Sequence, residues 1–151
     1  MKLYIAYGSN MNVGQMAYRC PGAEISGQSV IENYKLVFRR GVANIEPCQG
    51  CSVPIVLWRI TKADEISLDR YEGYPRFYVK QDFTVKHKGR RVKAMAYVMS
   101  QPFQVSEPSE FYIDTIMEGY EYFGIDHTEL LKAAELAGYS PSGVSNSFKL
   151  R

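Results

Sequence analysis

The hydrophobic pattern at the start of the chain predicts a buried strand that ends abruptly. Residues 2–7 are rich in Leu, Ile and Tyr, and the run stops at the small and polar residues 8–10. Asn12 and Gln15 then have the spacing of a capping box, so we expect a short helix, which must end before Pro21. The chain therefore predicts a strand, a turn and a helix at its start.

Two longer apolar segments predict a further pair of strands. Residues 28–40 and 51–60 are rich in β-branched and aromatic residues, and residues 44–51, with Pro, Cys and Gly, are expected to form the loop between them. Because Pro54 has no N–H to donate, we expect its strand to lie at a sheet edge or to begin with a bulge.

The middle of the chain predicts a helix followed by a hairpin. Thr61 and Asp64 form a second capping-box pair, and Gly73 is placed to end the helix as a left-handed cap. Two alternating strands, residues 77–87 and 90–99, then meet in a tight turn. We expect this hairpin to offer one apolar face to the core.

The last third changes to a helical period. Apolar residues recur at helical spacing between Ser109 and Gly124, and Asp126 with Glu129 predicts the cap of a second helix. Strands first, helices late and no regular βαβ alternation predict an α+β domain. Its sheet is expected to be mixed, mostly antiparallel and rolled toward a small barrel, in which the first strand is free to pair in parallel.

Size and charge narrow the class of protein. The 151 residues, 46% of them hydrophobic, suffice for one domain spanning 1–151, with a loosely held tail from about residue 140. A net charge of +2 gives no field that would attract nucleic acid or a membrane, so we expect a small-molecule partner. No stretch approaches the roughly 18 apolar residues of a membrane span, and the start "MKLYIAYGS" lacks the long apolar region of a signal, so we expect a cytoplasmic location. The basic run 86–93 is typical of a solvated strand edge.

Three cysteines are too few and too scattered for a disulfide framework. We therefore expect Cys20, Cys48 and Cys51 to be reduced thiols of a cytosolic protein. The spacing of Cys48 and Cys51 would also suit half of a zinc site or a redox pair, but further ligands such as His87 and His127 are at scattered positions. Two incidental loop thiols are the simpler interpretation, and we predict no metal or cofactor.

Two features carry candidate chemistry. The turn at residues 7–10 offers backbone N–H groups around a glycine, which suits an anion or oxyanion site, although a plain strand-to-helix turn would use the same residues. Glu72 falls at a helix C-terminus, where the dipole favours the neutral carboxyl group, and aromatic residues surround it in the sequence. Burial there would move its pKa toward neutrality, whereas a solvated glutamate would titrate normally.

The chain shows a specific resemblance that rests on four segments in this order: "YGSNM", "RCPGA", "SLDRYEGYPRFY" and "PSEFYIDTI". It resembles the γ-glutamylcyclotransferase-like family, including the AIG2-like branch, over nearly its whole length. The resemblance implies that the turn of Tyr7, Gly8, Ser9 and Asn10 cradles a γ-glutamyl group and that Glu72 is the acid/base. It further implies that Tyr78 and Tyr112 help to bind substrate.

In such enzymes the α-amine of the substrate attacks its own γ-carbonyl, which closes 5-oxoproline and releases an amine. The resemblance implies no metal, nucleotide or other cofactor. The chain departs from the family pattern around "EPCQGCSVPIV", because many relatives carry a glycine in the strand that here reads "SVPIVLW". The leaving group therefore stays open among γ-glutamyl amino acids, γ-glutamylamines, γ-glutamyl-ε-lysine and protected antibiotic intermediates. A non-catalytic protein that keeps the γ-glutamyl pocket, or a metal or redox protein built on the two close cysteines, remains the alternative.

Overall fold

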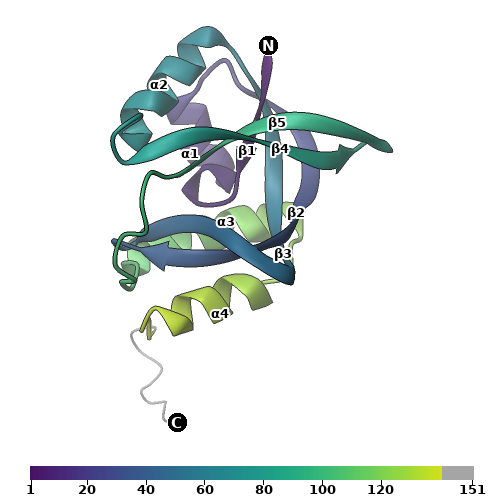
Figure 1. Ribbon diagram of the computed structural model, residues 1–151. Coiled ribbons are helices and arrows are strands. Elements are labelled where there is room, and N and C mark those ends of the chain that lie inside the picture. Colours follow the sequence, from purple (N-terminus) through teal and green to yellow (C-terminus); the bar gives the residue numbers. More distant parts are fainter. Residues whose placement is uncertain (141–151) are drawn as a thin grey trace.

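The computed structural model describes residues 1–140, which form five strands, four α-helices and a short 3-10 helix, η1 (Figure 1). The elements are β1 Lys2–Ala6, η1 Ser9–Met11, α1 Val13–Arg19, β2 Glu24–Arg39, β3 Val42–Ile60, α2 Lys62–Glu72, β4 Tyr78–His87, β5 Arg90–Met99, α3 Glu110–Phe123 and α4 Thr128–Leu136. The predicted tail from about residue 140 lies almost wholly outside the described residues.

The strands form one sheet in the order β2-β3-β1-β5-β4. Each neighbouring pair is antiparallel except β1 and β5, which are parallel. The predicted α+β class and mostly antiparallel mixed sheet are therefore confirmed. The sheet also rolls, because its two edge strands meet: Ser26 of β2 is hydrogen-bonded to the His87 ring of β4 at 2.8 Å.

The core forms around β1 and β5. Three consecutive residues of β1, Tyr4 to Ala6, and four of β5, Ala94 to Tyr97, are buried, so both faces of these central strands are covered. This burial explains why the start of the chain shows a continuous apolar run rather than alternation. In Figure 1, α1 and α2 lie together beside the sheet, and α4 runs along the β2–β3 hairpin.

The predicted loop at residues 44–51 is wrong, because these residues belong to β3. The chain reverses instead at Arg40 and Gly41, whose φ angles of 54° and 76° suit a tight hairpin turn. Residues 48–51 form a bulge opposite Asn33, which accepts a hydrogen bond from the Gly50 N–H at 3.0 Å. A bulge needs the same permissive residues as a loop, which is why composition misled the prediction.

The expectation for Pro54 fits the pairing. β1 pairs with β3 only over Val56–Ile60, so Pro54 lies beyond the end of β1 and pairs on one side only, with Val30 of β2. A missing N–H costs no ladder hydrogen bond on the side that has no partner strand.

The expectation of three reduced thiols is also wrong in part. Cys48 and Cys51 form a disulfide across the bulge, where their Cα atoms lie 5.5 Å apart, a separation within the range that disulfides require. In this state the pair supplies no thiolate for a metal. Cys20 is a free and buried cysteine.

Helix ends follow the predicted caps at most positions. The Thr61–Asp64 capping box and the left-handed Gly73 bound α2, and Ser109 and Gly124 bound α3. The cap predicted for α4 is wrong, because Asp126 accepts from the N–H of Thr128, two residues later, and His127 is the N-cap.

Among the described residues, no helix combines the length and the apolar character needed to cross a membrane.

Candidate active site

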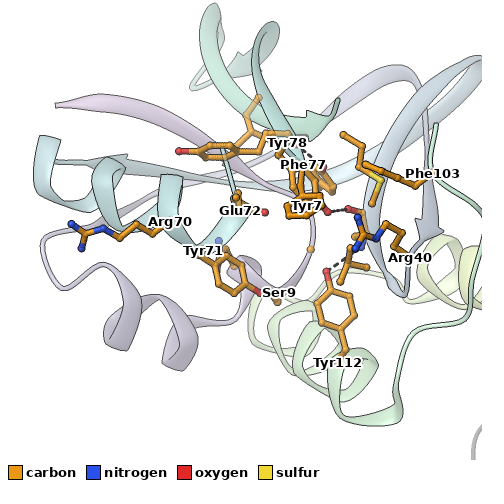
Figure 2. A pocket seen from close by; sticks show the side chains of 18 of the residues that line it. Tyr7, Ser9, Arg40, Arg70, Tyr71, Glu72, Phe77, Tyr78, Phe103 and Tyr112 are labelled. Carbon is orange, nitrogen blue, oxygen red and sulfur yellow. Dashed lines mark hydrogen bonds between the residues drawn. The ribbon is translucent and has the colours of Figure 1, made fainter. Parts of the chain in front are cut away.

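A cavity of about 460 Å³ opens where the end of β1, the end of α2 and the tip of the β2–β3 hairpin meet (Figure 2). All of the predicted site residues line it, which brings together segments far apart in the sequence. These are Tyr7, Gly8, Ser9, Asn10, Glu72, Tyr78 and Tyr112. Their roles toward a substrate stay predictions.

The turn after β1 contributes backbone donors to the cavity wall. Ser9 and Asn10 begin the 3-10 helix, and within residues 1–140 their N–H groups have no hydrogen-bond partner, as expected at a helix start. Gly8 allows Ala43 and Tyr112 to lie close to the turn. A Cβ at position 8 would lie 3.2 Å from the Cβ of Ala43 and 3.3 Å from the hydroxyl of Tyr112.

The side chain of Asn10 is fully used inside the protein. Its amide donates to the Tyr4 hydroxyl at 2.9 Å, its carbonyl accepts from Arg19, and its backbone carbonyl accepts from the Trp58 indole at 3.0 Å. The Asn10 side chain therefore holds the turn in place, and only its N–H is open to a ligand. Arg19 also stacks on the ring of Tyr71, 3.4 Å from its centre.

Glu72 is the last residue of α2, and among residues 1–140 it is the single acidic side chain on the cavity wall. Its carboxyl group forms no hydrogen bond or ion pair within residues 1–140. Burial raises the pKa of Glu72 to about 7, and the nearby Arg19 offsets part of that rise. Figure 2 shows Glu72 among the side chains of Tyr7, Tyr71 and Tyr78. Such a group exchanges protons readily near neutral pH.

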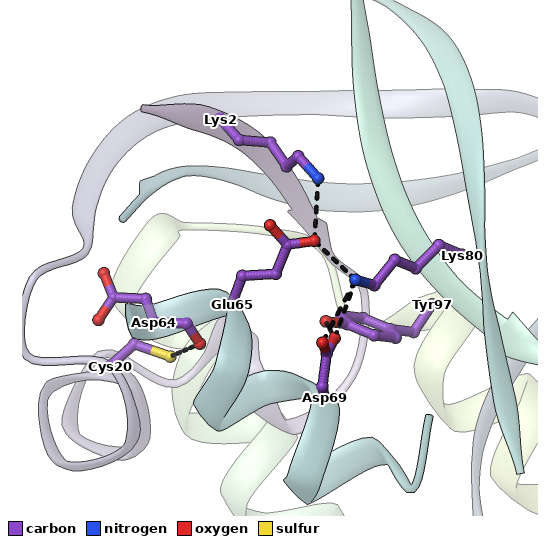
Figure 3. A network of polar contacts seen from close by, with 7 residues as sticks. All are labelled: Lys2, Cys20, Asp64, Glu65, Asp69, Lys80 and Tyr97. Carbon is purple, nitrogen blue, oxygen red and sulfur yellow. Dashed lines mark hydrogen bonds and ion pairs between the residues drawn. The ribbon is translucent and has the colours of Figure 1, made fainter. Parts of the chain in front are cut away.

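A polar network fixes the helix that carries Glu72 (Figure 3). Asp69, one turn before Glu72, accepts from the Tyr97 hydroxyl of β5 at 2.6 Å and pairs with Lys80 of β4 at 3.1 Å. Lys80 also pairs with Glu65 at 2.7 Å. Because α2 is tied to two strands in its last turns, its C-terminal residue is held at the cavity.

Tyr78 and Tyr112 meet at the backbone of Ala43. The Tyr78 hydroxyl donates to the Ala43 carbonyl at 2.8 Å, and the Ala43 N–H donates to the Tyr112 hydroxyl at 3.1 Å. Burial raises the pKa of both hydroxyls well above the usual range, so both stay neutral. The Tyr112 hydroxyl accepts a hydrogen bond here and is also linked to the side chain of Ser9, which ties it to the turn, whereas the hydroxyl proton of Tyr78 is committed to the fold.

Comparison with known proteins identifies the family. The sequence profile described as "Gamma-glutamyl cyclotransferase, AIG2-like" matches residues 4–122. The chain belongs to this γ-glutamyl cyclotransferase family. Its relatives include the mouse gamma-glutamylcyclotransferase, 30% identical over 88% of this chain and 78% of that protein, and the human gamma-glutamylcyclotransferase, 29% identical over 91% and 81%.

A solved structure supports the fold of this family member. A structure titled "Gamma-glutamyl cyclotransferase" superposes with a TM-score of 0.78 at 24% identity, and the match covers 97% of this chain and 92% of that one. The family and its curated relatives confirm the expectation of an enzyme.

Several cavity residues of this γ-glutamyl cyclotransferase family member were not among the predicted site residues. Arg40 lies at the hairpin turn, Phe77 precedes β4, and Phe103 follows β5 without any periodic pattern. The positive φ of Arg40 is unusual for a non-glycine residue, and no sequence motif marks it. Phe77 lies in the recognised segment "SLDRYEGYPRFY", where it was predicted only as one of the aromatic residues that could bury Glu72.

Proposed function

We propose that this protein is a cofactor-free γ-glutamylcyclotransferase that converts a γ-glutamyl compound into 5-oxoproline and a free amine. One observation supports the proposal most directly. The carboxyl group of Glu72, with a pKa of about 7, shares a cavity with the backbone N–H groups of Ser9 and Asn10, which have no partner among residues 1–140. These are the groups that the reaction needs.

The reaction closes a ring within the substrate. The α-amine nitrogen attacks the γ-carbonyl carbon, and the carbonyl electrons move onto its oxygen as the tetrahedral intermediate forms. The N–H groups of Ser9 and Asn10 stabilise that negative oxygen, because they are fixed donors at the start of η1. When the C–O double bond re-forms, the bond to the leaving nitrogen breaks.

Glu72 carries the proton between the two nitrogens. As a carboxylate it accepts a proton from the attacking amine, and as a neutral acid it donates that proton to the leaving nitrogen. A carboxyl group with its ordinary pKa would be a weak base for the first step. The raised pKa of Glu72 makes both steps accessible near neutral pH.

The cavity supplies the folded conformation that the attack requires. In this proposal the turn residues and the Tyr112 hydroxyl hold the γ-glutamyl group, and the rings of Tyr7 and Tyr78 form walls of the cavity. Alignment of an intramolecular reaction can contribute about 7–11 kcal/mol of the barrier. No metal or nucleotide enters this scheme.

Product analysis tests the proposal. We expect purified protein, treated with chelator, to form 5-oxoproline and free amine in equal amounts from at least one of a panel of γ-glutamyl amino acids and γ-glutamylamines. Chromatography of both products measures the reaction. Tight binding of the panel without 5-oxoproline would instead support a non-catalytic γ-glutamyl-binding protein, and loss of activity on chelation would contradict the cofactor-free scheme.

The pH dependence follows from the same carboxyl group. Because the first step requires the carboxylate of Glu72, we expect kcat/KM to rise with pH through about 7. The substrate amine titrates separately, at higher pH. Rate measurements between pH 5 and 9 should show the rise near pH 7 that Glu72 causes and, at higher pH, a second rise as the substrate amine loses its proton. The rise near pH 7 should be absent from the residual activity of the Glu72→Gln variant. A rate that is flat through pH 7 would contradict the role of Glu72.

A further inference from the structure

Arg40, at the tip of the β2–β3 hairpin, lies at the mouth of the cavity, and hydrogen bonds hold the backbone of this tip in place. The N–H of Arg40 donates to the carbonyl of Gln104 at 2.9 Å, and the side chain of Arg39 donates to the carbonyl of Phe103 at 2.7 Å. The segment after β5 thus fastens the hairpin turn. Arg40 is consequently a fixed part of the cavity wall rather than a residue on a free loop.

The guanidinium of Arg40 rests on two aromatic rings. Its central carbon lies 4.6 Å from the ring centre of Phe77 and 5.0 Å from that of Phe103. Cation–π contacts of this kind hold the plane of the group and leave the N–H groups at its edge free.

Arg40 has no carboxylate partner within residues 1–140. Its neighbour Arg39 differs, since it is paired with Glu46. Arg40 therefore presents several free donors in a planar fork, the arrangement that binds a carboxylate with two parallel hydrogen bonds.

The other cations near the cavity are less suited to this task. Arg19 is engaged with Asn10 and the ring of Tyr71. Arg70 lines the wall, but Figure 2 shows its side chain extending away from the other labelled residues, whereas Arg40 lies beside Phe103. A negative group bound at the hairpin end of the cavity would therefore meet Arg40.

We propose that Arg40 determines substrate specificity by binding a carboxylate on the leaving group. The inference rests on the proposed cyclotransferase function, in which the turn at Ser9 and Asn10 takes the γ-glutamyl end. The opposite end of the substrate then reaches the aromatic mouth of the cavity, at the exposed Phe77 and the partly buried Phe103. The preferred substrates are γ-glutamyl derivatives of α-amino acids, whose carboxylate lies one carbon from the scissile nitrogen, rather than γ-glutamylamines.

Three matched substrates separate this role from general charge effects. γ-Glutamyl-alanine carries the leaving-group carboxylate, γ-glutamyl-alaninamide replaces it with a neutral group of the same shape, and γ-glutamyl-ethylamide lacks it. We expect kcat/KM of the native enzyme to be about 10- to 100-fold higher for the first than for the other two, as for a charge-assisted bidentate contact. Formation of 5-oxoproline measures each rate.

The Arg40→Gln variant should remove this preference. Its kcat/KM on γ-glutamyl-alanine should fall to the level of the neutral substrates, whereas its rate on γ-glutamyl-alaninamide should change by less than about threefold. That second rate also shows that the variant is folded. Arg40→Lys keeps the charge without the fork and should retain an intermediate preference, and Arg90→Gln, which removes the same charge from the distant β4–β5 turn, should behave like the native enzyme.

The outcomes distinguish the two proposals. An equal loss on all three substrates after Arg40→Gln would place Arg40 at the γ-glutamyl end and overturn the leaving-group assignment. A native enzyme without preference for the carboxylate would overturn it as well. In both cases the cyclotransferase function would stand. If no γ-glutamyl compound yields 5-oxoproline, the proposed function fails, and the role of Arg40 fails with it.

Discussion

Replacing Glu72 by glutamine should reduce kcat/KM for 5-oxoproline formation by about 10²- to 10⁴-fold, because it removes the proton acceptor and donor but keeps the shape of the side chain. Glu72 is half-buried and its carboxyl group has no hydrogen-bond or ion-pair partner in the described part of the chain, so glutamine breaks no such contact there. Initial rates on the best substrate of the panel measure the loss. Near-normal turnover would remove Glu72 from the mechanism.

The same substitution should make the protein more stable above neutral pH. The folded-state pKa of Glu72 lies near 7, above the value of 4.5 for an unperturbed glutamate, so the folded protein binds the proton more tightly than the unfolded chain. Native stability therefore falls as pH rises from 4.5 to 7, by on the order of 3 kcal/mol at most. Urea denaturation at pH 5 and pH 8 should show that the gain of Glu72→Gln appears only at the higher pH. Glu135→Gln on the exposed face of α4 is the control, and it should change neither activity nor stability.

Replacing Gly119 by alanine should destabilise the protein and disturb the cavity together. A Cβ at Gly119 of α3 would lie 2.7 Å from the backbone carbonyl of Met11 and 3.0 Å from the N–H nitrogen of Asn12, so helix and turn must move apart. We expect a loss of about 1–3 kcal/mol in the free energy of unfolding, after the small gain in helix propensity. Because the displaced segment continues Ser9 and Asn10, kcat/KM should fall as well.

Denaturation by urea and 5-oxoproline formation measure the two effects of Gly119→Ala. Glu121→Ala lies on the same helix with an exposed side chain and is the matched control. It should leave both quantities unchanged. Full stability of the Gly119→Ala variant would show that α3 and the turn are less tightly packed than the structure indicates. Full activity despite a loss of stability would show that catalysis does not depend on the exact position of the turn.

The sequence correctly predicted those helix ends and turns that depend on residues close together in the chain. The capping box of Thr61 and Asp64, the left-handed cap Gly73 and the turn at Lys88 and Gly89 each depend on residues that are neighbours in the sequence. Their chemistry can therefore be read without knowledge of the fold. The parallel pairing of β1 with β5 was left open for the opposite reason, since it joins distant segments.

The candidate site was predicted through motifs and only partly through chemistry. A motif indicated Asn10, but not that its side chain would be committed to Tyr4 and Arg19. Arg40 and Phe103 were missed because nothing in the neighbouring sequence brings them together; a hairpin turn and the segment after β5 do so. The disulfide between Cys48 and Cys51 was missed because the bulge that aligns them depends on the pairing of β2 with β3. The single domain, the small-molecule partner and the cytoplasmic location stay predictions.

The peptide of Ala43 has a consequence for folding kinetics. Its N–H is bound by Tyr112, 69 residues further along the chain, and its carbonyl by Tyr78, 35 residues away. Contacts between such distant residues form slowly, because the loops between them must close first. The β4–β5 hairpin and the helices can form before these contacts exist, but the cavity cannot. In a refolding experiment, enzyme activity should therefore return later than helical and strand signals, and it should mark the arrival of the complete native state.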